Sequence, residues 1–444
     1  MRQEWTSVLA IIALTAGCAK HKSHTFLPGT ALAPSLSSST TNPPIPTTET
    51  SPPTTPTPPV LEGGPEARFL YVANPAAGTV SQLAFDSSRG NFASVGAPVL
   101  TGGSYPWALA VDPVGRFLYC ANRGSNDVSC FTIDPESGGL KLVPAGAPRS
   151  NPTKPKLVDK KVYSTPFFTI RTLVFEVPGG PSESPATVTA STGAAPSALA
   201  VSPDGTRLVV LNRFDGSLGS YRIDRTTGQL TPAHLMVFDN NQTPSDLAFD
   251  PEGGSFFVCC GPRGFVGRVK IHQAGLMKQA GPVLGVGRSP VALAVSPKGD
   301  KVVVATHPDD TVWTLVVGAD GKLAHKDKVK VQGDPSAIAF GPTGETVYVT
   351  AKHAAKLFAY SFNAKGKLGP DGSPVSTGAA PTGLAVDQGG GLVYTANVGD
   401  RFISLFELDP ITRNPGVGKP VEIPAPASQE AAPGPGARSI VAVR

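Results

Sequence analysis

Arginine follows asparagine at two places where an apolar run ends, Asn122-Arg123 and Asn212-Arg213. A guanidinium presents its N–H donors as a planar fork that matches a carboxylate or a phosphate, so anion binding is one interpretation of Arg123 and Arg213 and a structural role is the other. An asparagine at a strand end more often bonds the backbone of a turn than a ligand, and both interpretations stay open for Asn122 and Asn212.

One histidine lies in a setting where it could act as a base. His307 belongs to the segment Thr306-His-Pro-Asp-Asp310, in which a carboxylate would orient the ring. The plain alternative is a solvated loop histidine, so His307 is kept as a candidate and no catalytic residue is assigned.

Cofactor and nucleic-acid signals are weak throughout the sequence. The glycine-rich segments 261–267 and 281–287 resemble phosphate loops, but neither opens a helical pattern. No Cys-x-x-Cys or His-x-x-x-His pattern supports a zinc site, and no run of five Lys or Arg accompanies the net charge of +5. We therefore expect no cofactor, no metal and no nucleic-acid partner.

An internal repeat is the strongest structural signal. Each copy has a short apolar run, a turn of the type Asp/Ser-Pro-x-Gly and a second run of β-branched and aromatic residues, and the six clear copies start at Pro106, Pro196, Pro244, Pro290, Pro335 and Pro381. Proline and glycine favour a tight turn, so each copy predicts two antiparallel strands. A third strand and a looser fourth follow, and four short strands per ~45 residues are typical of an all-β propeller blade. The 49 glycines and 46 prolines exclude a helical bundle.

The number of blades depends on residues 107–195. Pro106 and Pro196 are 90 residues apart, about two repeats, and the strand-like pieces between Pro155 and Val177 predict a degenerate eighth blade. The alternative is a structureless surface insertion and seven blades. The C-terminal segment 437–444 resembles an inner strand and Arg68–Asn74 a second strand, so we expect both ends to share one blade and close the ring.

The propeller places the candidate residues at one end of its channel. Loops that enter each first strand and leave each second strand open on the same face, where ligands usually bind. We expect the following side chains at this mouth, beside His307: Trp107, Asn122, Arg123, Asn212, Arg213, Asp246, Lys352, His353 and Asn397.

The N-terminus carries an export signal. The apolar stretch from Val8 to Leu14 is too short for a permanent membrane span, and it ends in Thr15-Ala-Gly before Cys18. Small residues before a cysteine resemble the bacterial lipobox, which implies acylation of Cys18 and an outer-membrane lipoprotein of the cell envelope, held on the membrane by its lipid. We predict a signal peptide at 1–17, the anchor with a disordered Pro/Thr/Ser-rich tether at 18–65, and the propeller at 66–444.

Two further motifs carry a family resemblance. The endings Tyr71-Val-Ala-Asn74 and Tyr119-Cys-Ala-Asn122, with turns such as Asp224-Arg-Thr-Thr-Gly-Gln-Leu230, resemble the lactonase-type β-propellers, a family of 6-phosphogluconolactonase-like proteins and YVTN-repeat surface proteins. Asn122-Arg123-Gly124 and Asn212-Arg213 resemble its anion-binding segment. The histidines that its lactonases carry at the entry of inner strands are replaced here, as at Trp107 and Asp246, and their glutamate is missing after Cys260.

These departures decide the functional expectation. We expect a binding or scaffold module at the envelope, for a small anion, a polysaccharide or a protein, and more readily a non-enzyme than an enzyme. The alternative is a lactone hydrolase with an altered catalytic set, for which the proton-transfer partner is not visible in the sequence. A purely structural surface protein is the third possibility.

Overall fold

The computed structural model describes residues 68–86, 91–144, 162–164, 169–173, 190–238, 242–261, 263–387, 389–400, 402–423 and 439–443. The predicted signal peptide (1–17), lipidated Cys18 and tether (18–65) lie outside these residues. Within the described residues, no helix has the length and apolar character needed to cross a membrane.

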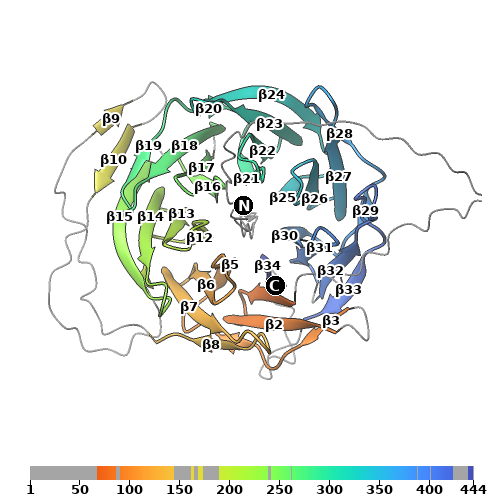
Figure 1. Cartoon of the computed structure of the whole chain (residues 1–444), viewed down its shortest axis with the longest axis horizontal. Helices are drawn as coiled ribbons and strands as arrows, with labels where there is room; N and C mark the ends of the chain where they lie inside the picture. The colour runs from red at the N-terminus through yellow and green to blue at the C-terminus, as the bar shows by residue number, and fades with distance from the viewer. Residues whose placement is uncertain are drawn as a thin grey trace, which may run out of the picture. The chain divides into compact units, whose positions relative to one another are not determined.

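Seven antiparallel sheets stand radially around a common centre, where a propeller has its central channel (Figure 1). From the channel outward, blade 1 contains β34 (Ser439–Val443), β1 (Phe69–Asn74), β2 (Thr79–Asp86), β3 (Asn91–Ser94) and β4 (Val99–Leu100); blade 2 contains β5 (Pro106–Val111), β6 (Phe117–Asn122), β7 (Asp127–Ile133), β8 (Leu140–Leu142) and β11 (Ala190–Ser191). Blade 3 contains β12 (Pro196–Val201), β13 (Arg207–Asn212), β14 (Ser217–Ile223), β15 (Leu230–Phe238), β10 (Thr169–Leu173) and β9 (Val162–Ser164).

The remaining four blades follow in chain order. Blade 4 contains β16 (Pro244–Phe249), β17 (Ser255–Cys260), β18 (Phe265–Ile271), β19 (Met277–Gln279) and β20 (Leu284–Gly285); blade 5 contains β21 (Pro290–Val295), β22 (Lys301–Thr306), β23 (Thr311–Val317) and β24 (Leu323–Lys330). Blade 6 contains β25 (Pro335–Phe340), β26 (Thr346–Ala351), β27 (Lys356–Phe362), β28 (Leu368–Pro370) and β29 (Val375–Ser376); blade 7 contains β30 (Pro381–Val386), β31 (Leu392–Asn397), β32 (Phe402–Glu407) and β33 (Lys419–Glu422).

The prediction of eight blades is wrong and the seven-blade alternative is right. Strands β8 and β11 both pair with β7, so they are two halves of one fourth strand, and residues 143–189 interrupt it. The insertion is not structureless, because its strands β9 and β10 extend the outer edge of blade 3 through β15. The insertion is about as long as one repeat, so the 90 residues between Pro106 and Pro196 match the length of two blades although they contain one.

The predicted closure of the ring is confirmed. Strand β1 pairs with β34, with Leu70 opposite Ala442 and Val72 opposite Ile440. The last strand of the chain therefore forms the inner strand of the blade whose other strands come first, and the ring has no free inner edge at this point.

The turn between the first two strands also joins neighbouring blades. In each of the six repeats the turn glycine has φ between +68° and +75° and donates its N–H to the carbonyl three residues earlier. A Cβ added to Gly205, Gly253, Gly299, Gly344 or Gly390 would lie 3.1–3.3 Å from a ring carbon of the proline in the preceding blade's turn. The Pro-x-Gly motif therefore provides both the turn and a close contact between blades.

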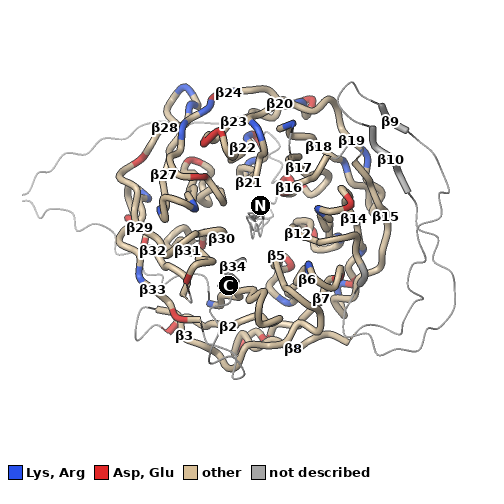
Figure 2. The backbone as a smooth tube through the Cα atoms, turned by 180° about the vertical axis from the view of Figure 1, so that it is seen from behind, with Lys and Arg blue, Asp and Glu red and all other residues tan. Residues whose placement is uncertain are grey.

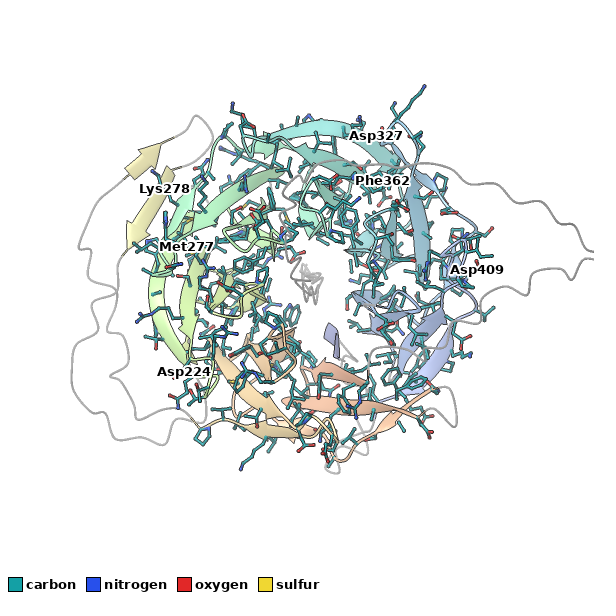
Figure 3. The ribbon with its side chains drawn as sticks, viewed as in Figure 1. Asp224, Met277, Lys278, Asp327, Phe362 and Asp409 are labelled. Atoms are coloured by element: carbon teal, nitrogen blue, oxygen red, sulfur yellow. The ribbon has the colours of Figure 1, made fainter. Side chains whose placement is uncertain are left out.

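Apolar side chains fill the spaces between blades, and charge collects on the periphery. The strands are buried with few exceptions, and Figure 3 shows their side chains packed from the channel outward to peripheral turns such as those of Asp224 and Asp409. The outer strand β24 carries exposed Lys326, Lys328 and Lys330 at alternate positions, and Lys and Arg gather near β24 and β28 in Figure 2. Lysine on an edge strand opposes pairing with another chain.

Candidate functional site at the channel mouth

A repeated backbone hydrogen bond builds one end of the channel. The residue after each second strand donates its N–H to the carbonyl of the residue before the corresponding inner strand, over 2.8–3.1 Å. We call these residues the rim residues, and they are Arg123, Arg213, Gly261, His307, Lys352 and Val398. Blades 2 to 7 therefore each place one residue at an equivalent point of the mouth, and five of the six carry a side chain.

The rim backbone is held in an unusual conformation. The residue before the inner-strand proline has a positive φ in five blades, +43° to +67°, at Tyr105, Ala195, Ser289, Asp334 and Ala380. Aspartates from the loop after the second strand accept backbone N–H bonds across this entry loop, from Ala194 to Asp215 (2.8 Å) and from Arg288 to Asp309 (2.6 Å). Strained backbone that is fixed in this way occurs most often at binding and catalytic sites.

Two rim arginines from neighbouring blades lie close together. The guanidinium of Arg123 lies 4.3 Å from the ring centre of Trp107 and 5.5 Å from that of Phe214, and Tyr105 stacks on Trp107. Burial lowers the pKa of Arg213, and the positive charge of Arg123 lowers it further. Burial also lowers the pKa of Arg123. We call Arg123 and Arg213 the arginine pair.

The arginine pair lacks a counter-ion from the protein. In the part of the chain that the structure describes, neither guanidinium makes an ion pair or a side-chain hydrogen bond. Partly buried charges are normally paired, and two like charges side by side are unfavourable. An anion with two or more acceptor oxygens would relieve both costs. Anion binding is therefore the chemistry that this arrangement favours.

A second cluster joins blades 5 and 6 across the mouth. Nδ1 of His307 contacts Oδ1 of Asp334, and Nδ1 of His353 lies 3.4 Å from Oδ2 of the same carboxylate. The Asp334 side chain is 10% exposed, whereas those of His307 and His353 are 44% and 71% exposed. A buried carboxylate between two accessible imidazoles can orient them for proton transfer.

The carboxylate beside His307 comes from an unexpected place. The sequence analysis looked for it within the segment 306–310, but Asp309 pairs with Arg288 at 3.1 Å. Asp334 lies directly before the inner strand of the next blade. Sequence reasoning missed Asp334, and also Tyr105 and Phe214 beside Arg123. The only available signal was their place next to strand ends, which the repeat already marked.

Four candidates do not line the mouth. Asn122, Asn212 and Asn397 are fully buried, and Nδ2 of Asn122 donates to Oδ1 of Asp127 and to Oγ of Ser129, both over 2.7 Å. Asn212 and Asn397 donate in the same way to Ser217 and Ser404. The asparagines are thus part of the blades, because each bonds the third strand of its own sheet.

Asp246 is the fourth candidate that lies inside the ring of blades. Its side chain is buried and accepts N–H bonds from Leu247 (2.9 Å) and from Leu293 on the next inner strand (2.8 Å). Burial raises the pKa of Asp246 well above its usual value. Of the remaining candidates, Trp107 lies buried under Arg123, Lys352 is half-buried on the rim and His353 is exposed. No group of three His, Cys, Asp or Glu side chains in the described residues is arranged to hold a metal ion.

Seven four-stranded blades with a cationic mouth define a propeller of the lactonase type. The chain belongs to the family described as "Lactonase, 7-bladed beta-propeller", whose model matches residues 44–156, 175–274 and 318–430.

Individual relatives agree with this assignment. A 6-phosphogluconolactonase of Pectobacterium atrosepticum is 28% identical over 125 residues, which span 28% of this chain and 36% of the relative. A putative 6-phosphogluconolactonase of Bacteroides fragilis has a TM-score of 0.64 at 17% identity and covers 87% of this chain and 100% of its own. A periplasmic gluconolactonase of Pseudomonas aeruginosa has a TM-score of 0.63 at 18% identity, with coverages of 85% and 99%. At these identities the solved structures establish the fold alone.

Proposed function

We propose that the protein is a lactone hydrolase whose substrate carries an anionic group. Family membership favours this alternative over the binding or scaffold module that the sequence analysis placed first. The observation that carries the proposal is the arginine pair, two rim arginines on neighbouring blades with no counter-ion among the described residues.

The arginine pair would act by holding the anionic end of the lactone. Trp107 and Phe214 contact Arg123 through its guanidinium, and stacking of this kind leaves the in-plane N–H groups available to a carboxylate or a phosphate. Such charge-assisted bonds contribute about 1.5–3 kcal/mol each, enough to orient a small ligand. Hydrolysis then adds water to the lactone carbonyl and opens the ring to a hydroxy acid.

The hydrolase is proposed to act at the bacterial cell envelope as an outer-membrane lipoprotein. The apolar stretch before Cys18 and the Pro/Thr/Ser-rich segment after it support this location. Replacement of Cys18 with serine should move the protein from the membrane fraction to the soluble fraction of the producing cell. Equal membrane retention of Cys18→Ser would contradict a lipid anchor.

Hydrolysis assays test the activity. The full chain is mixed with five- and six-membered sugar lactones, with and without a phosphate or carboxylate, and acid release is followed. We expect turnover of the anionic lactones and a rise in KM of at least tenfold for Arg213→Gln. Arg222→Gln removes the same charge from the one exposed position of the otherwise buried β14 and should leave KM unchanged. Tight binding of an anionic lactone without turnover would instead favour the binding module.

A further inference from the structure

We propose that His307 is the general base of this hydrolase and that Asp334 is its positioning residue. The inference rests on the proposed function and assigns the proton transfer to a histidine that the sequence analysis left as a candidate, with a carboxylate partner that the sequence did not show. Its basis is the contact between Nδ1 of His307 and Oδ1 of Asp334 at the channel mouth.

Backbone bonds fix both residues of this pair. His307 donates its N–H to the carbonyl of Ser289 over 3.1 Å. Asp334, at φ +67°, donates its N–H to Oδ1 of Asp310 over 3.1 Å and accepts the N–H of Lys352 over 2.8 Å. The relative position of ring and carboxylate is therefore set by the loop that leaves β22 and the loop that enters β25, which suits a catalytic pair.

Within the described residues, the carboxylate of Asp334 lies beside Nδ1 of His307 and no group bonds Nε2. A carboxylate beside Nδ1 favours the tautomer with its proton on Nδ1, and leaves the lone pair of Nε2 as an acceptor. The His307 side chain is 44% exposed, so water can reach it. The other charged groups around it are His353 on the second oxygen of Asp334, Lys352 and Asp310 on the adjoining loops, and the Arg288–Asp309 ion pair.

The proton-transfer sequence balances without a further reactant. Nε2 of His307 takes a proton from water as the water oxygen forms a bond to the lactone carbonyl carbon. The tetrahedral intermediate then collapses, the ring C–O bond breaks, and the imidazolium returns the proton to the leaving ring oxygen. The product is a hydroxy acid and His307 is neutral again. The carboxylate of Asp334 stabilises the transient imidazolium.

The fold itself does not require these two side chains. The position of Asp334 is occupied by Ala195 and Ala380 in blades 3 and 7, with the same sign of φ. The position of His307 is occupied by Gly261 and Val398 in blades 4 and 7. The rim hydrogen bonds form with these smaller residues, so a role in folding does not explain the His307–Asp334 contact.

His307 also faces the same mouth as the arginine pair. It holds the rim position in blade 5 that Arg213 holds in blade 3 and Arg123 in blade 2. The proposal therefore requires a ligand that reaches from the arginine pair on blades 2 and 3 to His307 on blade 5.

Two variants test the assignment. His307→Gln should lower kcat for the anionic lactone by about 10²–10⁴-fold with little change in KM, the usual contribution of a general base. Asp334→Ala introduces the residue of blades 3 and 7, and should lower kcat by at least tenfold. His272→Gln changes an exposed turn histidine of blade 4 and should leave kcat unchanged. Equal thermal midpoints of the variants show that they fold.

A spectroscopic measurement separates positioning from a structural role. Two-bond ¹H–¹⁵N correlation spectra of the histidine rings should show His307 as the Nδ1–H tautomer in the wild type and as a mixture in Asp334→Ala. Wild-type kcat in His307→Gln, with Arg213→Gln still impaired, would overturn the base and leave the proposed function standing. Absence of turnover of every lactone by the wild type would overturn both.

Discussion

At the scale of single residues, a tyrosine hydroxyl explains why the Tyr-x-x-Asn ending and the Asp-x-x-x-Gly turn occur together in this sequence. The hydroxyl of Tyr71 donates to the carbonyl of Gly138 over 2.8 Å, and Tyr119 donates to Gly228 over 3.1 Å. Each tyrosine belongs to a Tyr-x-x-Asn ending, and each glycine to the Asp-x-x-x-Gly turn of the next blade. The two motifs are therefore the two halves of one contact between blades.

Removal of this hydroxyl should destabilise the ring. Tyr71→Phe leaves the buried carbonyl of Gly138 without its donor, and we expect a loss of about 1 kcal/mol in the free energy of unfolding. Tyr105→Phe is the matched control, because the hydroxyl of Tyr105 makes no hydrogen bond within the described residues and its side chain is exposed. Denaturant titration measures both, and equal stabilities of the two variants would contradict the role of the contact.

The buried carboxyl of Asp246 predicts a pH dependence of stability. Its pKa is raised by burial in the folded chain, so the native state binds the proton more tightly than the unfolded chain, whose aspartate pKa is about 3.9. This contribution is fully present below pH ~4 and is lost as pH rises through the raised pKa, by at most about 1.4 kcal/mol per pH unit.

A comparison with Asp246→Ala isolates that contribution. Alanine occupies the same position in four inner strands, at Ala108, Ala198, Ala292 and Ala337. The free energy of unfolding of the wild type should fall relative to that of Asp246→Ala between pH 4 and neutrality. The pKa of Asp127 is also raised by burial, but Asp127 is present in both proteins, so its contribution cancels when the two free energies of unfolding are subtracted. A difference that does not change with pH would contradict an elevated Asp246 pKa.

At the scale of elements, the fourth strand is the part of the blade that tolerates change. It is split into two short pieces in blades 1, 2, 4 and 6, and in blade 6 both β28 and β29 pair with β27. The long insertion of blade 2 enters at this split, between β8 and β11. The three inner strands of every repeat keep nearly constant lengths, because they pack against neighbouring blades on both sides.

Excision of the insertion should leave the seven blades intact. In this variant, residues 144–189 of blade 2 are replaced with a copy of residues 280–283, the four-residue connection between β19 and β20. The split fourth strand of blade 2 then has the same short connection as that of blade 4. We expect a folded chain with a similar circular dichroism spectrum and a small loss of stability, since β15 loses its partner β10. A chain that no longer folds would show that 144–189 contributes to the ring and contradict its description as an insertion.

At the scale of the whole molecule, the ring depends on five residue pairs between its two ends, from Phe69 with Val443 to Ala73 with Ser439. Deletion of residues 439–444 would leave the edge of β1 unpaired and remove the inner strand of blade 1. We expect a fall in the thermal midpoint of many degrees and association of the truncated chain in size-exclusion chromatography. Arg444 follows β34 in the sequence, so deletion of Arg444 alone should change neither the thermal midpoint nor the association state. A stable monomer after the longer deletion would contradict closure of the ring by the β1–β34 pair.

The sequence was sufficient for the repeat, the strand order and the closure, because each depends on local patterns of turns and alternating apolar residues. It misled on blade number, since a long insertion in the split fourth strand of blade 2 matches one repeat in length. It also placed Asn122 and Asp246 at the mouth, although the side chain of Asn122 is hydrogen-bonded within its blade and that of Asp246 to the next blade. The Asp334–His307 contact joins loops of different blades, and no local pattern marks such a pair.

The specificity for a charged lactone tests the central claim most directly. The ratio of kcat/KM for 6-phosphogluconolactone to that for unphosphorylated gluconolactone is measured for the wild type and for Arg123→Gln/Arg213→Gln. Two charge-assisted contacts predict a wild-type ratio of at least tenfold that falls close to one in the double variant. A ratio that is the same in both proteins would contradict the assignment of the arginine pair as the anion-binding site.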